Sequence, residues 1–439
     1  MSSFLVEGKA KLSGSISVTG NKNEALPLIA AALLCSEEVE LENVPEIGDV
    51  RKMLKIASVL GAQVGTLENN KVTIKAATLK DSNLPVDLST AIRASVLFAS
   101  SLLVRTGRAV ITEPGGDLIG RRRLDTHFLV FKALGARLEV QHTLSSDITR
   151  ETTFILEAPE GGLKGADIYL DEASVTATEN ALIAAAGAKG TTVIANAASE
   201  PHVQGLCKFL QSMGVQIEGV GSNILTVHGV TSFCSSKHRT GADYIEAGSF
   251  IGLAAATGSS LTITDIDPSV MRMVLFQFER IGVNVIMDRK KKSLHVPQNQ
   301  HLTIRKDLGG AIPHIEDSPW PGFPSDLMSI LLVTAIQSEG TCLIHEKMFE
   351  SRLFFVDKLI SMGASIVLCD PHRAVIVGKT QLYGATFSSP DIRAGMALLI
   401  AAMAADGKSL IHNIEQIDRG YQQIDTRLNA LGAKIKRID

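Results

Sequence analysis

The stretch SMGASIVL, residues 361–368, has a glycine directly after an apolar helical pattern and an alternating apolar pattern directly after the glycine. Glycine after the last apolar residue of a helix is typical of a left-handed cap, and a period of two is typical of a strand. The pattern occurs six times, about seventy to eighty residues apart, with its glycine at Gly61, Gly135, Gly214, Gly282, Gly363 and Gly432. We therefore predict six copies of a motif of helix, cap and strand.

A second glycine marker alternates with the first. It closes an Ala-rich helical stretch and precedes a β-branched strand, as in LAAATGSSLTITD at 253–265. Its members are Gly107, Gly190, Gly258, Gly340 and Gly407, and the opening copy AAALLCSEEVEL has none. Repeats of this length, each with two helices and several strands, are too long for a solenoid. They predict an α/β protein of six small modules, three in each of two lobes.

The length and one polar passage predict where the lobes divide. A chain of 439 residues is longer than one ordinary hydrophobic core requires. The Ser-rich passage TSFCSSKHRTGAD, residues 231–243, lies between the third and fourth copies, as a boundary would. We expect an N-terminal lobe of residues 22–240, which carries a mobile loop around 112–123, and a C-terminal lobe of residues 1–21 and 241–439.

The Ala-rich helices have small or apolar residues on most faces. They can be buried on every side, so we expect helices inside and sheets outside. A Rossmann fold is the alternative for an α/β chain. However, no G-x-G-x-x-G follows a predicted strand, and VGKT at 377–380 lacks the upstream glycine of a phosphate-binding loop.

The composition disfavours several classes of protein. With a formal net charge of -3 the chain is not a typical nucleic-acid binder, so anionic ligands would have to meet local clusters of cations. We find no signal-peptide pattern, and the longest apolar stretches, such as 396–405, are about half as long as a membrane span. We expect a soluble, cytoplasmic protein. The five cysteines are widely spaced, and neither disulfides nor a zinc site is expected.

Five motifs together carry a family resemblance. They are VTGNKNEALPLIAAALL (18–34), the Gly-Gly turn in VITEPGGDLIGRRRLDTH (110–127), GFPSD (322–326), FESR (349–352) and IDRGY (417–421). In this order, over nearly the whole chain, the sequence resembles the enolpyruvyl transferases. The resemblance implies an inside-out α/β barrel in each of two lobes, built from six repeated units, which agrees with the count of glycines.

The resemblance also implies a reaction. The enolpyruvyl group of phosphoenolpyruvate passes to the 3-hydroxyl of UDP-N-acetylglucosamine and phosphate is released, with no metal or organic cofactor expected. Members that act on shikimate 3-phosphate usually have Ser-Lys-Ser where this chain has Asn21, Lys22 and Asn23, so that acceptor is the second choice. A non-catalytic paralogue that binds the sugar nucleotide is a further alternative, although Lys22, Asp326 and Arg419 are all present.

Several cations are expected because both substrates are anions. Phosphoenolpyruvate has a carboxylate and a phosphate, and the sugar nucleotide has a diphosphate. The residues that the resemblance assigns to phosphoenolpyruvate are Lys22, Arg122, Arg393 and Arg419, with Arg352 close by. Those that it assigns to the sugar nucleotide are Asn23, Arg93, Arg122, Arg123, Leu124, Asp125, Thr126, Ser174, Val175, Asp326 and Met348.

Asp326 has the most specific of these implied roles. It resembles the family carboxylate that bonds the 3-hydroxyl and accepts its proton as the carbon–oxygen bond forms. Its place at the start of the apolar run PSDLMSILLV also predicts a helix N-cap. The two interpretations are compatible.

Asp117 stands in the Gly-Gly turn, where most family members have a cysteine. The spacing alone favours a simple turn residue, whereas the resemblance implies a group that gives a proton to the methylene carbon and takes one back. A free carboxyl is almost fully ionised at neutral pH. To act as an acid, Asp117 would need its pKa raised by desolvation or substrate charge, against the effect of the arginines at 121–123.

Three further expectations concern the same region. Pro114, Gly115 and Gly116 suit a mobile lid, because glycine permits large backbone changes. The antibiotic fosfomycin alkylates the family's cysteine, so a chain with aspartate there is expected to be insensitive. Glu172 stands where many members have a lysine near the nucleotide, and the arginines at 121–123 are expected to compensate.

Overall fold

The computed structural model describes residues 2–117, 119–120, 122–144 and 150–438. Contacts within the chain divide it into two compact units, and each is described by itself. Unit 1 contains Met1–Thr19, Asp117–Arg121 and Ala242–Asp439, and unit 2 contains Gly20–Gly116 and Arg122–Gly241. The short segment that begins at Asp117 therefore belongs to unit 1, although the residues on both sides of it belong to unit 2.

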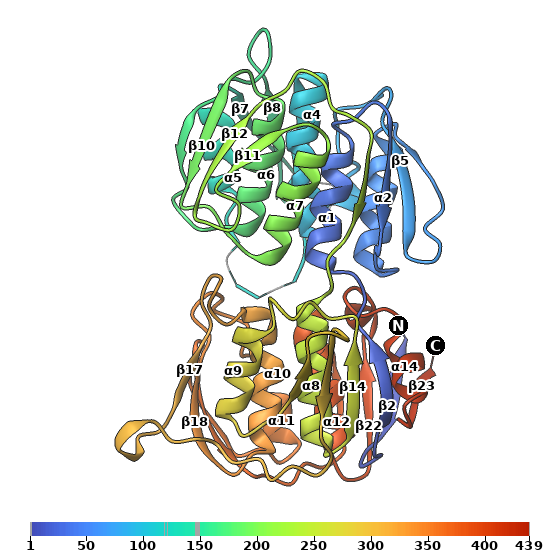
Figure 1. The fold of residues 1–439 in the computed structure, drawn as a ribbon, viewed down its shortest axis with the longest axis vertical. Helices are drawn as coiled ribbons and strands as arrows, with labels where there is room; N and C mark the ends of the chain where they lie inside the picture. The colour runs from blue at the N-terminus through green and yellow to red at the C-terminus, as the bar shows by residue number, and fades with distance from the viewer. Residues whose placement is uncertain (1, 118, 121, 145–149, 439) are drawn as a thin grey trace. The chain divides into compact units, whose positions relative to one another are not determined.

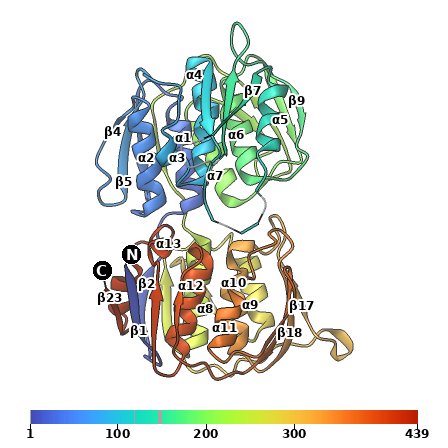
Figure 2. The same cartoon turned by 180° about the vertical axis from the view of Figure 1, so that it is seen from behind.

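Figure 1 and Figure 2 show the elements from opposite sides. Those of unit 2 are α1 (Lys22–Ala32), β3 (Glu38–Glu42), α2 (Gly48–Val59), β4 (Gln63–Val64), β5 (Lys71–Lys75), α3 (Val86–Ser89), the 3-10 helix η1 (Arg93–Leu97), α4 (Phe98–Thr106), β6 (Arg108–Thr112), α5 (Asp125–Ala133), β7 (Arg137–Leu144), β8 (Arg150–Glu157), β9 (Asp167–Tyr169), α6 (Val175–Ala186), β10 (Thr191–Ala195), α7 (Pro201–Ser212), β11 (Gln216–Glu218), β12 (Ile224–His228) and β13 (Ser236–Arg239).

Unit 1 is built from the two ends of the chain. Its elements are β1 (Ser3–Glu7), β2 (Ser13–Ser17), α8 (Tyr244–Thr257), β14 (Ser260–Thr264), α9 (Arg272–Arg280), β15 (Ile286–Asp288), β16 (Ser293–Val296), the 3-10 helix η2 (Leu308–Gly310), β17 (His314–Glu316), α10 (Ser325–Ile336), β18 (Gly340–His345), α11 (Val356–Ser361), β19 (Ile366–Asp370), β20 (Arg373–Gly378), β21 (Thr386–Ser388), α12 (Ile392–Ala404), β22 (Lys408–His412), α13 (Glu415–Asp418), α14 (Ile424–Asn429) and β23 (Ile435–Ile438).

The elements repeat in the order inner helix, strand, outer helix and two more strands. One copy is α6, β10, α7, β11 and β12, whose sheet has the order β11-β12-β10-β9. In this copy β10, the strand after the inner helix, pairs antiparallel with β12, the last strand. It also pairs in parallel with β9, which precedes the inner helix α6. Over the described residues the strands form six sheets, three in each unit, of which five have four strands and the sheet β6-β8-β7 has three. The six predicted modules are therefore confirmed.

The chain crosses between the units without breaking this pattern. β2 precedes unit 2 in sequence, yet it pairs in parallel with β14 of unit 1. β13 precedes α8 in sequence, yet it pairs in parallel with β3 of unit 2. Each unit therefore completes a sheet with a strand distant in sequence, and unit 1 does so twice, because β1 pairs with β22 and β23. The glycine pattern could not indicate these pairings.

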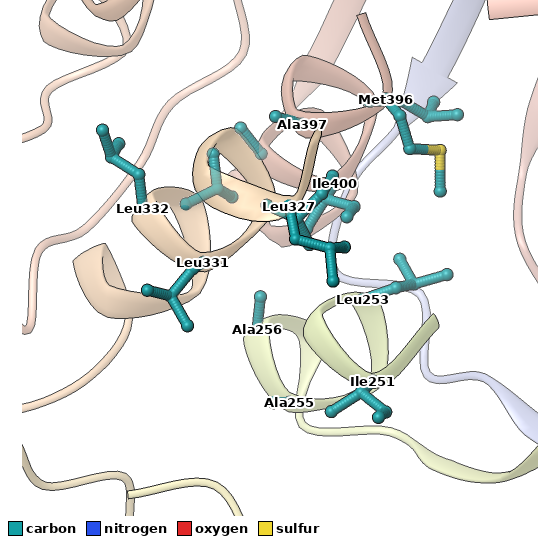
Figure 3. Close-up of a cluster of buried hydrophobic side chains, with 14 of the residues drawn as sticks. Ile251, Leu253, Ala255, Ala256, Leu327, Leu331, Leu332, Met396, Ala397 and Ile400 are labelled. Atoms are coloured by element: carbon teal, nitrogen blue, oxygen red, sulfur yellow. The ribbon is translucent and has the colours of Figure 1, made fainter. Parts of the chain in front are cut away.

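The inner helices are buried almost completely, as their composition predicts. All residues of α8 and α12 are buried, and Asp326 is the one residue of α10 that is not. Figure 3 shows buried apolar side chains of these three helices, with Leu327 of α10 and Ile400 of α12 next to each other and Ala256 of α8 pointing toward α10. Their small and branched side chains allow close packing without a polar face. The helices therefore lie inside and the sheets outside.

The glycine markers behave as predicted. The six caps of the outer helices have positive φ, from 88° at Gly282 to 110° at Gly61. The second series also has positive φ, from 62° at Gly258 to 122° at Gly340, and a strand begins at each glycine or within two residues after it. This backbone region favours glycine, which has no Cβ.

Among the described residues no helix has both the length and the apolarity that crossing a membrane requires.

Candidate functional site

The first group of candidate residues lies where inner helices of unit 1 begin. Asp326 is in the first turn of α10, and Arg393 is in the first turn of α12. The N-cap of α10 is Pro324, which makes no side-chain cap bond, so the N-cap interpretation of Asp326 is wrong. Its carboxylate instead bonds arginines, because two buried guanidinium groups need a nearby anion.

Asp326 connects two arginines that are distant in sequence. Its Oδ1 accepts a bond of 2.9 Å from Nη2 of Arg352, and its Oδ2 accepts one of 2.9 Å from Nη2 of Arg393. Both arginines are 3% exposed, whereas the Asp326 side chain is 27% exposed. Burial lowers the pKa of Arg393, but Asp326 and Tyr421 together raise it by more than burial lowers it. The pKa of Arg393 therefore lies above its ordinary value. The pair of cations therefore stays charged beside a partly accessible carboxylate.

The other inner helix of unit 1 contributes to the same group. Arg393 Nη1 donates to the hydroxyl of Tyr421, which also bonds Ser249 of α8 at 2.8 Å. Asp243 caps α8 by accepting from two backbone N–H groups, and burial raises its pKa to about 6. Asp391 caps α12 in the same way. Capped helix starts and buried arginines together favour an anionic ligand at this end of unit 1.

Asp117 pairs with Arg419. Arg419 Nη1 donates to Asp117 Oδ1 at 2.6 Å and to Gln416 Oε1 at 2.7 Å, and both side chains of the ion pair are mostly buried. Arg419 is the C-cap residue of α13. Sequence analysis named both residues but did not predict their contact. The arginines that it placed against Asp117 were those at 121–123, of which Arg121 lies outside the described residues.

The last candidate residue of unit 1 is Met348, which follows β18 and is 39% exposed. Within the described part of the chain, no side-chain hydrogen bond of Met348 defines a role for it. Its assignment to the sugar nucleotide therefore stays a prediction.

The candidates of unit 2 also lie at helix starts. Lys22 is the first residue of α1, and its Nζ lies 2.8 Å from Oδ2 of Asp49, in the first turn of α2. Both side chains are less than a tenth exposed. Asn21 caps α1, and Asn23 is the one residue of α1 that is not buried. The structure therefore places Lys22 in a buried ion pair and Asn23 next to it, facing outward.

Arg93 and Arg122 lie close to the Gly-Gly turn. A Cβ on Gly116 would lie 3.0 Å from Cβ of Arg93 and 3.4 Å from Nη1 of Arg122. A Cβ on Gly115 would lie only 1.6 Å from the carbonyl oxygen of Thr90. Glycine is thus required here by close packing, whatever the loop does on binding. Burial lowers the pKa of Arg93 to about 10, and the charge of Arg122 adds to this.

The starts of α5 and α6 bring the remaining candidates of unit 2 together. Arg123 donates to Asp125 at 3.0 Å, and Thr126 donates to Asp171 at 2.7 Å. Leu124 is the buried N-cap of α5. Ser174 caps α6, of which Val175 is the first residue. These contacts surround two helix N-termini, where a diphosphate would be favoured.

The sequence has the acid Glu172 where a cation near the nucleotide is expected, and the structure places this acid near the candidate arginines. The side chain is exposed. Burial lowers the pKa of Arg93, and the charge of Glu172 partly opposes this. The bond with Asp125 raises the pKa of Arg123, and the charge of Glu172 adds a smaller contribution. It therefore acts on two of the cations that were assigned to the nucleotide. Any anion bound by these arginines would also be repelled by Glu172.

Sequence analysis missed His127, which is 1% exposed on α5. Asn180 Nδ2 lies 2.8 Å from its Nδ1, and Thr176 Oγ1 lies 3.3 Å from its Nε2. Burial lowers its pKa to about 3, with contributions from Arg93 and Arg122, so the ring is neutral at pH 7. It connects α5 and α6 beside the candidate cations. A single histidine in an apolar helical pattern gave no signal of this contact.

We assign no metal to this chain. Over the described residues, one group has the spacing of metal ligands: His314, Glu316 and His345. The two imidazoles bond each other at 3.2 Å, and Glu316 pairs with Lys347 at 3.2 Å. These groups thus satisfy one another.

The sites in the two units divide the candidate residues. Unit 1 contains Asp117, Asp326, Met348, Arg352, Arg393 and Arg419, and unit 2 contains Lys22, Asn23, Arg93, Arg122, Arg123, Leu124, Asp125, Thr126, Ser174 and Val175. Each unit thus has buried or partly buried cations at helix starts, and unit 1 has in addition the two carboxylates Asp117 and Asp326.

Comparison with solved structures concerns the fold. Enolpyruvyl transferase NikO from Streptomyces tendae matches with a TM-score of 0.84 at 24% sequence identity, covering 99% of this chain and 98% of that one. EPSP synthase from Acinetobacter baumannii matches with a TM-score of 0.74 at 18% identity, over 100% of both chains. The inside-out α/β architecture predicted from the sequence is therefore that of solved enolpyruvyl transferases.

Comparison of sequences gives the family. A model described as EPSP synthase (3-phosphoshikimate 1-carboxyvinyltransferase) matches residues 6–428. UDP-N-acetylglucosamine 1-carboxyvinyltransferase of Treponema denticola is 53% identical over 436 residues, which cover 99% of both chains. The enzyme of the same name from Bradyrhizobium diazoefficiens is 51% identical over 435 residues, which cover 99% of this chain and 98% of the relative. Since the family model and these relatives span nearly the whole sequence, the chain belongs to the enolpyruvyl transferase family.

Proposed function

We propose that this enzyme transfers the enolpyruvyl group of phosphoenolpyruvate to the 3-hydroxyl of UDP-N-acetylglucosamine and releases phosphate. The observation that carries the proposal is the identity of about one half, over the full length, to enzymes named for this transfer. The reaction is the first committed step toward peptidoglycan, which requires a cytoplasmic enzyme. We further propose that lobes of residues 22–240 and of residues 1–21 with 241–439 perform it together.

The cations of both units suit two anionic substrates. Arg352, Arg393 and Arg419 of unit 1 and Lys22 and Arg122 of unit 2 bind the carboxylate and the phosphate of phosphoenolpyruvate. Arg352 and Arg393 of unit 1 pair with the carboxylate of Asp326, and Arg419 pairs with that of Asp117. Binding therefore exchanges an internal anion for a substrate anion, which limits the cost of dehydrating the cations.

The acceptor needs a base and a set of positioning groups. Asp326 accepts the proton of the 3-hydroxyl while the oxygen attacks C2 of phosphoenolpyruvate. Its partial exposure and its two arginine bonds support this role, because they leave an ionised carboxylate at the surface of the site. The helix starts that contain Asn23, Thr126 and Ser174 suit the rest of the nucleotide.

Asp117 supplies the proton for C3. Proton addition to the methylene carbon forms a methyl group and leaves positive charge at C2, which the acceptor oxygen attacks. Loss of phosphate with removal of one methyl proton then restores the double bond. When a substrate anion takes over Arg419, Asp117 is released from its ion pair and becomes available to the methylene carbon. The pair of Asp117 and Arg419 supports this sequence of events.

Phosphate release tests the function. The purified protein should release phosphate from phosphoenolpyruvate only when UDP-N-acetylglucosamine is added. Shikimate 3-phosphate in its place should give no release, and activity with it alone would favour the second acceptor. Binding of UDP-N-acetylglucosamine by calorimetry without any phosphate release would favour the non-catalytic paralogue.

Fosfomycin is expected not to inactivate this enzyme. The antibiotic is opened by a thiolate, and a carboxylate is a much weaker nucleophile than a thiolate. Incubation with fosfomycin before the phosphate assay should leave the rate unchanged over time. Rapid time-dependent inactivation, with a mass increase on Asp117, would contradict the expectation.

Lys22→Ala is expected to weaken phosphoenolpyruvate binding far more than nucleotide binding. Loss of one charge-assisted contact to an anion costs about 1.5–3 kcal/mol, which corresponds to about ten- to a hundredfold in affinity. Calorimetric Kd values for the two ligands provide the measurement, and Lys22→Arg serves as the charge-preserving control. Melting temperatures are needed because Asp49 stays buried in the alanine variant. Equal losses for both ligands would remove Lys22 from the phosphoenolpyruvate site.

A further inference from the structure

Two buried acidic residues of unit 1, Asp317 and Glu346, lie next to each other and close to Arg352. Asp317 directly follows β17, and Glu346 directly follows β18. The two strands are parallel neighbours with Glu316 opposite His345, so the register brings Asp317 and Glu346 side by side. Both side chains are 0% exposed. Two adjacent carboxyl groups without access to water cannot both be ionised at low cost.

The hydrogen bonds occupy one oxygen of each acid and leave the other oxygen of each without a donor among the described residues. The N–H of Lys347 donates to Asp317 Oδ1 at 2.5 Å, and the hydroxyl of Ser325 donates to Glu346 Oε1 at 2.7 Å. The remaining oxygens, Oδ2 of Asp317 and Oε2 of Glu346, are buried and meet no N–H or hydroxyl donor within the described part of the chain. A proton between these two oxygens satisfies both. Burial and the contact with Asp317 hold the pKa of Glu346 well above its usual range.

The pair continues into the candidate site through one hydroxyl. Ser325 Oγ accepts a bond of 3.0 Å from Nε of Arg352, and Arg352 Nη2 donates to Asp326 at 2.9 Å. Ser325 can donate to Glu346 and accept from Arg352 at once, so every donor in this chain of bonds has an acceptor. Arg352 Nη1 is buried and has no partner over the described residues. The orientation of the guanidinium therefore depends on Ser325 and Asp326.

We propose that Glu346 and Asp317 share one proton and, through Ser325, position Arg352 and with it the base Asp326 for enolpyruvyl transfer. The proposal rests on the proposed function. Glu346 is a positioning residue, because it touches neither substrate nor reacting atoms. It acts as a neutral acid, which leaves the charge of Arg352 for Asp326 and for a substrate anion.

Activity distinguishes positioning from charge. Glu346→Gln keeps the acceptor for Ser325 and offers an N–H to Asp317, so kcat and both KM values should stay close to wild type. Glu346→Ala removes both bonds, and a misplaced Arg352 should lower kcat/KM for phosphoenolpyruvate by about ten- to a hundredfold. The KM for UDP-N-acetylglucosamine should change less. A Gln variant as inactive as the Ala variant would overturn the proposal.

Two further variants separate positioning from a loss of stability. Ser325→Ala cuts the link to Arg352 without changing either acid, and it should reproduce part of the effect on kcat/KM. Ile376→Ala, on β20 of the same sheet, removes a fully buried side chain and lowers the melting temperature. It should leave both KM values unchanged. If this control shifted the KM for phosphoenolpyruvate as Glu346→Ala does, a general loss of stability would explain both variants and the proposal would fail.

Stability against pH tests the shared proton without any activity. A group whose pKa is raised on folding contributes stability below its unfolded pKa and loses it as the pH rises. Near pH 4.5 and below, wild type and Glu346→Gln should melt alike. Between pH 4.5 and about pH 9 the Gln variant should melt at a higher temperature, by a margin that grows with pH and then stays constant, because Gln does not ionise. The groups that face the Glu346 side chain are Asp317, Arg352 and Ser325, and Nδ1 of His372 lies 2.6 Å from the Glu346 carbonyl oxygen.

The opposite sign would show an ionised Glu346. If Glu346→Gln melted below wild type with a deficit that grew toward alkaline pH, Glu346 would be a charged partner of Arg352 and the proposal would fail. The result is independent of the proposed function. An enzyme without phosphate release would refute that function, while the melting curves would still decide the state of the pair.

Discussion

Asp117→Asn is expected to lower kcat by about a hundred- to ten-thousandfold, the usual contribution of a general acid or base. Asparagine has the size of aspartate and still accepts a bond from Arg419, but it cannot give a proton to C3 or take one back. Single-turnover phosphate release at saturating substrates measures the effect.

Binding should respond in a different way from turnover. The Kd for UDP-N-acetylglucosamine should stay nearly unchanged. That for phosphoenolpyruvate should be unchanged or lower, because residue 117 no longer competes as an anion for Arg419. An Asn variant with normal turnover would remove Asp117 from the mechanism.

Asp117→Cys is the matched control, since it introduces the residue that most of the family has at this position. It should retain turnover. It should also become sensitive to fosfomycin, with the mass of the adduct on residue 117. If Asp117→Cys folds but is inactive, the environment of residue 117 supports proton transfer by a carboxyl group and not by a thiol.

Asp326→Ala is expected to have the second large effect, on both activity and stability. Removal of the base should lower kcat by about a hundred- to ten-thousandfold. It also leaves Arg352 and Arg393 buried without the carboxylate that connects them, and breaking a buried ion pair costs about 3 kcal/mol or more. Denaturant unfolding and phosphate release measure the two effects.

A surface pair of the same chemistry controls for the ion pairs themselves. Asp307 bonds Arg280 at 3.1 Å, and its side chain is 47% exposed. Asp307→Ala should cost less than about 1 kcal/mol, because exposed pairs contribute little. Asp326→Asn should lose turnover with a smaller loss of stability, since one acceptor oxygen remains. If Asp326→Ala unfolded no more easily than Asp307→Ala, the arginines would be stabilised by other groups.

The fold was predictable from local sequence signals. Gly214 and Gly363 end helices in a positive φ region and are followed by strands, as their neighbours predicted. The Ala-rich stretches became the buried inner helices because small side chains permit contact on every face. Such signals depend on a few adjacent residues, so they can be read without knowledge of the rest of the chain. The crossing of β2 and β13 depends on distant pairing and was not predictable in this way.

The sequence supplied candidate residues for the site but not the contacts between them. The motifs named Asp326, Arg352 and Arg393 separately, but only the folded chain shows that one carboxylate joins both arginines. The N-cap prediction for Asp326 failed because Pro324 occupies the cap and the arginines compete for the carboxylate. The sugar-nucleotide and phosphoenolpyruvate assignments stay predictions until ligands are measured.

The amino-acid sequence by itself determined the α/β class, the six repeats, the buried inner helices and the family, because each follows from local periodicity, glycine positions or motifs in order. The tertiary structure alone decided which charges meet: Asp117 with Arg419, Lys22 with Asp49, and Glu346 with Asp317. Charge interactions depend on distances of a few ångströms in space, and the sequence positions of the two partners follow no repeating pattern. They are therefore settled only when parallel strands and helix starts bring distant segments together.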